Sequence, residues 1–208
     1  MENSVPDYIQ NSRRAKTFVT EVMPVISTES IRGALLVLVG HFDELMKEYF
    51  LNLALIQYTP REAKELFNLG GPFSSLSAKI KIARACGTLP KELCLMIEAF
   101  REARNKAAHE TEDFDMEKWW QSIGSKLDCV GKGLSKAIID GQKGFISHLL
   151  SKVRGGDSVF EHGDFASPKV KWTIRLMLLG ISLTALIEIM FEAEIARITK
   201  ARARTGSS

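Results

Sequence analysis

Apolar residues recur every three or four positions along most of the chain, which is the spacing of one face of an α-helix. The clearest run begins at Ile31 and continues to Ile56, and a second apolar row beside it widens the face. A helix with such a broad apolar face needs neighbours on several sides, so we expect it at the centre of the fold. The two rows are Ile31, Leu35, Leu38, Phe42, Leu45, Tyr49, Leu53 and Ile56, and Leu36, Val39, Met46 and Phe50.

Capping residues and glycines predict where the next helices begin and end. Thr59-Pro60-Arg61-Glu62 is a capping box with proline at the first helical position, so a short helix should follow and end near Gly70-Gly71-Pro72. Ser74 or Ser75 can cap a further helix, which should stop at Gly87. Each of these predicted helix ends depends only on residues within a few positions of it.

The second half of the chain is less regular. Pro90 should begin a helix that continues to about Glu110, and a helix of weaker periodicity is expected from Asp115 to about Ile139. Seven glycines fall between Gly131 and Gly163, which indicates a broken helix or hairpin with a loop. Ser167-Pro168 should open a last long helix that continues to about Ala203.

No stretch alternates convincingly between apolar and polar residues, as a strand would. We therefore predict an all-α fold, an antiparallel helical bundle with a C-terminal long helix. The bundle should occupy residues 1–140, a Gly-rich connector residues 141–166, and the C-terminal helix with its basic tail residues 167–208.

Composition narrows the function classes. Hydrophobic residues make up 45% of the chain and charged residues 25%, as in an ordinary soluble globular protein. The three cysteines form no CxxC pair, so we expect no disulfide framework and no zinc site, in keeping with a reducing cytoplasm. The N-terminus lacks an apolar signal core, and no phosphate-binding or dinucleotide-binding glycine motif occurs. These features predict a cytoplasmic protein without metal or cofactor.

The net charge of +3 is small, but its distribution is uneven. Residues 167–208 hold seven basic and three acidic residues, chiefly because of Arg197, Lys200, Arg202 and Arg204. This end is either a solvated helix terminus or a contact for phosphate or lipid headgroups. In the same helix the weakly polar to apolar stretch Leu176–Ile187 is 12 residues long, whereas a membrane span needs about 20. A buried or oligomer-forming helix is therefore favoured over a membrane segment.

The segment 98–109 is the part of the chain that suggests chemistry. On a helical wheel Arg104 lies within about 40° of Leu93, Ile97 and Phe100, so it should interrupt the apolar stripe at its centre. Asn105 and His109 lie about 100° and 140° from it, around the small residue Ala108. One face would then present a guanidinium, an amide and an imidazole.

This pattern has a structural and a catalytic interpretation. Arg104 can extend to solvent at the helix end or pair with Asp43 or Glu44 on the central helix. In that case Asn105 binds backbone and His109 caps the helix. Catalytically, an imidazole can transfer a proton near neutral pH, and a guanidinium can stabilise the charge on a phosphorane when an RNA 2′-hydroxyl attacks the adjacent phosphate.

The residues Arg104-Asn105-Lys106-Ala107-Ala108-His109 resemble the R-N-x-x-x-H signature of the HEPN superfamily. That resemblance implies an all-helical domain, and many members are metal-independent endoribonucleases of toxin–antitoxin, phage-defence and CRISPR systems. They typically act as dimers with the signature helices at the interface. Carried over here, Arg104, Asn105 and His109 would be catalytic, Arg101 and Lys106 would bind substrate, and Asp43, Glu44 and Glu98 would be supporting acids.

A longer stretch is similar to the mannitol-repressor (MtlR) family. It comprises Arg32-Gly33-Ala34-Leu35-Leu36, Phe42-Asp43-Glu44-Leu45 and the block from Gly71 to Ala83, and it closes on the same Arg-Asn-x-x-x-His segment. Members are described as transcriptional regulators, yet no recognition helix with base-reading side chains is evident here. The two resemblances are compatible, because the mannitol-repressor fold is itself a HEPN-like bundle.

Two functions follow as expectations. The first is an endoribonuclease that acts on RNA as a homodimer, is controlled by an antitoxin or regulatory partner, and uses no cofactor. The second is a regulator that works through protein contacts without catalysis. A membrane-associated effector is a third possibility.

Other chemistry-bearing residues have simpler interpretations. His41 should pack within the central helix, and Asp43 and Glu44 should form solvated ion pairs with Lys47. Trp119-Trp120 should belong to the core with one partly exposed ring, the alternative being a base-stacking platform. His148 and His162 lie among acidic residues of the Gly-rich region, and we expect no metal site there.

Overall fold

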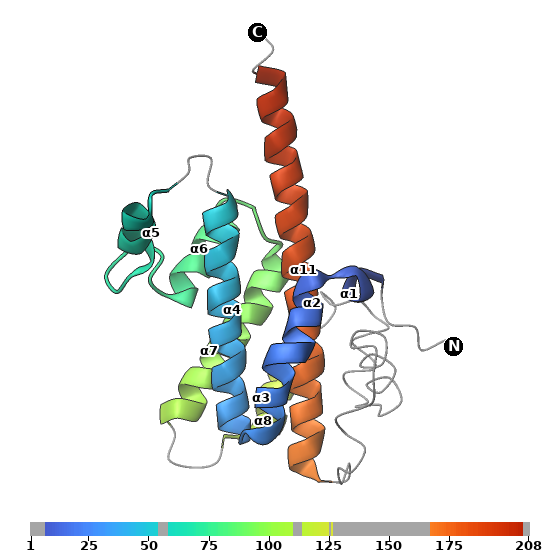
Figure 1. Ribbon diagram of the computed structural model, residues 1–208. Coiled ribbons are helices and arrows are strands. Elements are labelled where there is room, and N and C mark those ends of the chain that lie inside the picture. Colours follow the sequence, from blue (N-terminus) through green and yellow to red (C-terminus); the bar gives the residue numbers. More distant parts are fainter. Residues whose placement is uncertain (1–6, 54–57, 110–113, 125, 127–166, 206–208) are drawn as a thin grey trace.

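The computed structural model describes residues 7–53, 58–109, 114–124, 126 and 167–205. The part described is built of helices (Figure 1), as predicted. The elements are α1 (Asp7–Asn11), α2 (Arg13–Thr17), the π-helical turn η1 (Phe18–Val22), α3 (Met23–Thr28), α4 (Ile31–Leu53), α5 (Pro60–Phe67), α6 (Leu76–Ala85), α7 (Lys91–His109), α8 (Met116–Ile123) and α11 (Pro168–Thr205).

Helix α4 is central, because it packs on α7, α6, α3 and α11. Figure 1 shows α7 running opposite to α4, whereas α11 runs in the same direction as α4. The segment from α2 through η1 to α3 descends beside both α4 and α11, and α5 stands apart at the edge. Eight apolar residues of α4 are buried in one continuous core that also includes residues of α7, α8 and α11.

The predicted helix starts are confirmed by their hydrogen bonds. The Thr59 side chain accepts from the Glu62 amide while the Glu62 carboxylate accepts from the Thr59 amide, which is the capping box. Ser75, rather than Ser74, caps α6, and Asp115 caps α8. Gly87 follows α6 with φ of 66°, a left-handed conformation that glycine adopts without strain.

One apolar position of α4 is not where the pattern placed it. Leu36, expected in the second buried row, is 51% exposed. The reason is that α4 has packed neighbours around part of its circumference, and Leu36 and Gly40 lie on the remaining solvent side. Ile56, the helix expected beyond 126 as far as Ile139, the glycines of 131–163, Cys129, His148 and His162 lie outside the described residues.

The last helix, α11, is long and mostly buried along its first half. Its length and composition alone would allow it to cross a membrane. However, 78% of its most apolar 18-residue segment is buried against the rest of the molecule. Its polar residues Ser182 and Thr184 donate their hydroxyl hydrogens to carbonyls one turn back, at Leu178 and Gly180. The Arg175 guanidinium lies against both the Trp120 and the Trp172 rings, 4.8 and 4.6 Å from their centroids.

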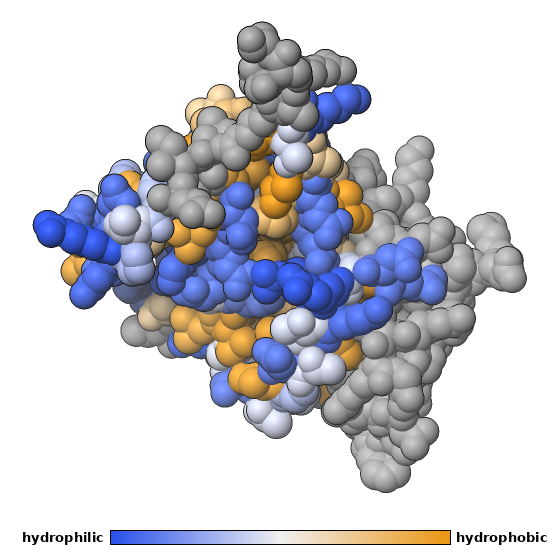
Figure 2. Space-filling view, turned by 45° about the horizontal axis from the view of Figure 1, so that its top comes forward, coloured by the Kyte–Doolittle hydropathy of each residue, from blue (hydrophilic) through white to orange (hydrophobic). Residues whose placement is uncertain are grey.

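The second half of α11 extends beyond the other helices (Figure 1). Its residues Glu192, Arg197 and Lys200 are exposed. Figure 2 brings this end of the molecule forward and shows hydrophilic residues over much of the face, with hydrophobic residues between them.

Candidate functional site

The Arg-Asn-x-x-x-His segment occupies the last two turns of α7. Arg104 and Asn105 are half-buried there, and Lys106, Ala108 and His109 are exposed. Because one continuous helix carries them, Arg104 and His109 are separated by about 7.5 Å along the helix axis. Neither is enclosed by packed neighbours.

The phase predicted for Arg104 is corrected by the structure. In these turns the core-facing positions are Phe100, Ala103 and Ala107, which are 0%, 0% and 2% exposed. The buried face of α7 is therefore centred on these three positions, and Arg104 lies at the edge of that face. A guanidinium at the edge of the buried face keeps its contact with water.

Arg104 is bonded to its neighbour in sequence. Its Nη1 donates to Asn105 Oδ1 over 3.0 Å. Within the described part of the chain no carboxylate forms an ion pair with Arg104. The amide of Asn105 thus holds the guanidinium without neutralising its charge.

Two of the proposed supporting acids have other partners. Asp43 Oδ1 lies 2.7 Å from Nζ of Lys79, a lysine that is 2% exposed. Glu44 pairs with Lys47 at 3.3 Å on the surface, as the solvated interpretation predicted. Asp43, expected to share Lys47, instead compensates the buried Lys79 charge, which burial would otherwise make costly. Neither acid supports Arg104 or His109.

The third acid, Glu98, also has a partner on α7. Its Oε1 accepts from Arg101 Nε at 2.9 Å and from Nη2 at 2.7 Å. This hydrogen bonding holds the pKa of Arg101 above its usual range. The charge of Arg101 is therefore compensated, so Arg101 contrasts with Arg104 as a candidate phosphate ligand.

His41 has a packing role. Its ring contacts Phe18 edge-on, at a centroid distance of 5.1 Å, and its Nε2 lies 2.9 Å from Thr184 Oγ1. Burial, followed by the positive charge of Arg14, lowers the pKa of His41 from 6.5 to about 4. The imidazole is neutral in the folded protein near pH 7, and it joins η1, α4 and α11.

This environment predicts a pH dependence of stability. Between pH 6.5 and 4 the unfolded chain binds a proton at His41 that the folded chain does not, so the free energy of unfolding should fall by about 3 kcal/mol as the pH drops through that window. Urea denaturation at several pH values measures it. His41→Gln, which keeps a hydrogen-bonding group for Thr184, should flatten this part of the profile; an unchanged profile would contradict the assignment.

The tryptophan pair belongs to the core. Trp119 and Trp120 are 8% and 6% exposed, and Trp119 Nε1 donates to the Ala99 carbonyl over 3.2 Å. The expected partly exposed ring is not observed, and both rings are too buried to stack on RNA bases. Within the described residues no group of three or more His, Cys, Asp or Glu side chains is placed to hold a metal ion.

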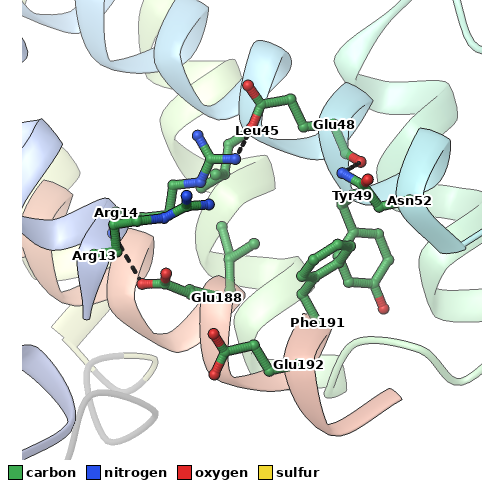
Figure 3. Close-up of a pocket in the computed structure, with 10 residues that line it drawn as sticks. Arg13, Arg14, Leu45, Glu48, Tyr49, Asn52, Glu188, Phe191 and Glu192 are labelled. Carbon is green, nitrogen blue, oxygen red and sulfur yellow. Dashed lines mark hydrogen bonds and ion pairs between the residues drawn. The ribbon is translucent and has the colours of Figure 1, made fainter. Parts of the chain in front are cut away.

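An open pocket of about 50 Å³ lies elsewhere, between α2, α4 and α11 (Figure 3). Its charged residues are Arg13, Arg14, Glu48, Glu188 and Glu192. Sequence reasoning missed them because they are distant in the chain. The sequence offered one indication of these residues: Glu188 is a carboxylate that directly follows the weakly polar to apolar stretch Leu176–Ile187.

Comparison of the chain with protein-family models, with curated proteins and with solved structures finds no significant match.

Proposed function

We propose that the chain is a HEPN-like, metal-independent endoribonuclease whose site is the C-terminal end of α7. The observation that carries the proposal is the guanidinium of Arg104, which is bonded to a neutral amide and shares an accessible stretch of helix with His109. A phosphate diester needs a fixed positive charge and a proton-transfer group, and these two residues supply one of each.

The reaction assigned to the site is an internal transesterification. His109 takes the proton from an RNA 2′-hydroxyl, whose oxygen attacks the adjacent phosphorus. The bond to the 5′-oxygen breaks, and the proton is returned to that oxygen, which leaves a 2′,3′-cyclic phosphate and a 5′-hydroxyl. Arg104 binds the non-bridging oxygens as their charge increases, and Asn105 positions Arg104. Lys106, exposed on the next turn, is a secondary phosphate contact.

The same geometry supports a homodimer. Arg104 and His109 lie on the outer surface of a helix, which alone does not enclose a nucleotide. Two copies that bring their α7 ends together would form a groove and provide a second imidazole as proton donor. We assign this activity to a cytoplasmic toxin, stress or phage-defence effector, held in check by an antitoxin or regulatory protein.

The direct test is incubation of the purified chain with structured and unstructured RNA. Cleavage should proceed equally with and without EDTA and should leave cyclic phosphate ends. Cleavage that is abolished by EDTA and restored by a divalent cation would contradict the proposed mechanism.

The second candidate is a mannitol-repressor-like regulator that acts through protein contacts. The observation in its favour is Leu36, an apolar side chain left 51% exposed on the solvent side of α4, which a protein partner would cover. Growth on expression separates the two. Toxicity that disappears in an Arg104→Gln, His109→Ala double variant supports the nuclease, and absence of toxicity from both forms supports the regulator.

A further inference from the structure

Arg101 and Glu98 form an ion pair on α7, on the turn before Arg104. Both hydrogen bonds of the pair go to one carboxylate oxygen, because Nε and Nη2 of Arg101 donate to Glu98 Oε1 over 2.9 and 2.7 Å. The other oxygen, Oε2, is buried and accepts no hydrogen bond from any residue that the structure describes. The carboxylate thus has donors at only one of its two oxygens, although burial makes an unmet acceptor costly.

This arrangement gives the Arg101 guanidinium a poorer partner than it can use. A guanidinium makes its strongest contact when two of its N–H groups reach two different oxygens of a carboxylate or a phosphate. Glu98 offers Arg101 one oxygen, whereas a phosphodiester group offers two non-bridging oxygens. A phosphate at this position therefore competes with Glu98 for the same N–H groups.

Arg101 is close enough to Arg104 to bind the same strand of RNA. The two residues are three positions apart on one helix, so their Cβ atoms lie about 5–6 Å apart on neighbouring turns. Both residues are half-buried, and the side chain of Arg101 is 25% exposed. A phosphate contact at Arg101 would extend the one assigned to Arg104.

Arg104 shows how an arginine of this helix is held without such a competitor. Its Nη1 donates to Asn105 Oδ1, an amide oxygen that leaves the charge of the guanidinium in place. Arg101 lies on the same helix, but its partner is a carboxylate that compensates the charge. Glu98→Gln would give Arg101 an amide partner as well, with almost no change in the shape of the side chain.

We propose that Glu98 competes with RNA for Arg101, so that this carboxylate limits the number of phosphates that the end of α7 binds. Arg101 is then a second phosphate ligand of the site, and Glu98 occupies it in the free protein. The inference rests on the proposed function, because the RNA strand must lie along this end of α7. It reverses the role that the family resemblance implied for Glu98, from an acid that supports the site to one that opposes binding.

The test measures binding rather than cleavage. A fluorescently labelled single-stranded oligouridylate is titrated with the full chain carrying His109→Ala, so that the RNA stays intact, and its anisotropy is followed. Adding Glu98→Gln should raise the affinity about fivefold near 0.1 M salt. The slope of log K against log salt should become steeper by about 0.7, the value for one added phosphate contact on a single strand.

Two further variants show whether Arg101 causes the gain. Arg101→Gln added to Glu98→Gln should return both the affinity and the salt slope to those of the His109→Ala chain. Glu102→Gln removes an equal charge from the exposed residue next to Arg101 and leaves the Glu98 pair in place, so it should change the affinity by less than about twofold. Urea denaturation of each variant establishes that it is folded.

The outcomes separate this competition from the proposed nuclease. RNA binding by the folded Glu98→Gln chain that is no tighter than that of its parent would overturn the competition. A gain that persists after Arg101→Gln would overturn it too, because the lost charge and not Arg101 would then explain the gain. The expected pattern of binding, in a chain whose wild type cleaves no RNA, would support the competition and reject the nuclease. RNA binding by none of these chains would reject both.

Discussion

Replacement of His109 by alanine should reduce RNA cleavage by a factor of about 10² to 10⁴, the usual contribution of a general acid–base group. His109 is exposed at the end of α7, so the variant should keep its free energy of unfolding within about 0.5 kcal/mol. Initial rates on a fluorescently labelled RNA and urea denaturation of the same preparation measure the two quantities.

Arg104 allows a finer comparison. Arg104→Gln removes the charge and should approach the loss caused by His109→Ala, whereas Arg104→Lys keeps the charge but loses the planar fork and should be intermediate. Lys91→Ala, an exposed cation at the other end of α7, is the matched control and should cleave at the wild-type rate. Wild-type cleavage by His109→Ala would remove the assigned role, whatever the Arg104 variants show.

The contrast between Arg101 and Arg104 explains why charge alone does not identify the site. Both are half-buried arginines on α7, three residues apart. Glu98 compensates Arg101 through two hydrogen bonds to one carboxylate oxygen, and Asn105 leaves Arg104 with its full charge. The sequence pattern predicted the helix that carries both arginines but could not give their hydrogen-bond partners, because side-chain torsions decide which neighbour each one reaches.

Features that depend on neighbouring residues were predictable from the sequence. The capping box at Thr59, the cap at Ser75 and the helix that follows Pro90 all use interactions spanning three or four residues. The all-α class follows in the same way from the spacing of apolar positions.

Features that depend on distant residues were not predictable. Asp43 is paired with Lys79, which is 36 residues away, and nothing near Asp43 indicates that a buried lysine will reach it. The apolar row with Leu36 and Phe50 widened the predicted face of α4, but the number of helices that pack around α4 decides how much of that face is covered. Leu36 is consequently left in solvent.

The position of α11 required the structure for the same reason. Its short apolar stretch favoured a buried or oligomer-forming helix over a membrane span, although the whole helix is long and apolar enough to cross a membrane. The observed packing assigns it to the core: Ile174, Leu178, Ile181 and Ala185 are each 2% exposed or less. A helix surrounded by lipid does not have to fit a matching protein surface along its length. A substitution that disturbs the packing of α11 should therefore destabilise a core helix but not a membrane span.

Gly180 on α11 is the residue at which such a defect has the largest expected effect. A Cβ atom built there would overlap the Phe18 ring and would lie 2.7 Å from Leu38 Cδ2. Phe18 and Leu38 are both fully buried, so neither side chain has space to move aside. Gly180→Leu should therefore lower the free energy of unfolding by about 3 kcal/mol, through overpacking at the junction of η1, α4 and α11.

Gly40→Leu on α4 is the matched control, because no atom lies within 4 Å of a Cβ built at that position. Replacing an exposed helical glycine there should raise the free energy of unfolding by about 0.5–1 kcal/mol. Tryptophan fluorescence during urea denaturation follows both variants, since Trp120 and Trp172 pack against each other across α8 and α11 at a centroid distance of 5.7 Å. If α11 instead crossed a bilayer at Gly180, leucine would be accepted at no cost, because an additional apolar side chain is favourable in lipid. Equal stability of Gly180→Leu and the wild-type chain would therefore contradict the packing of α11 against α4.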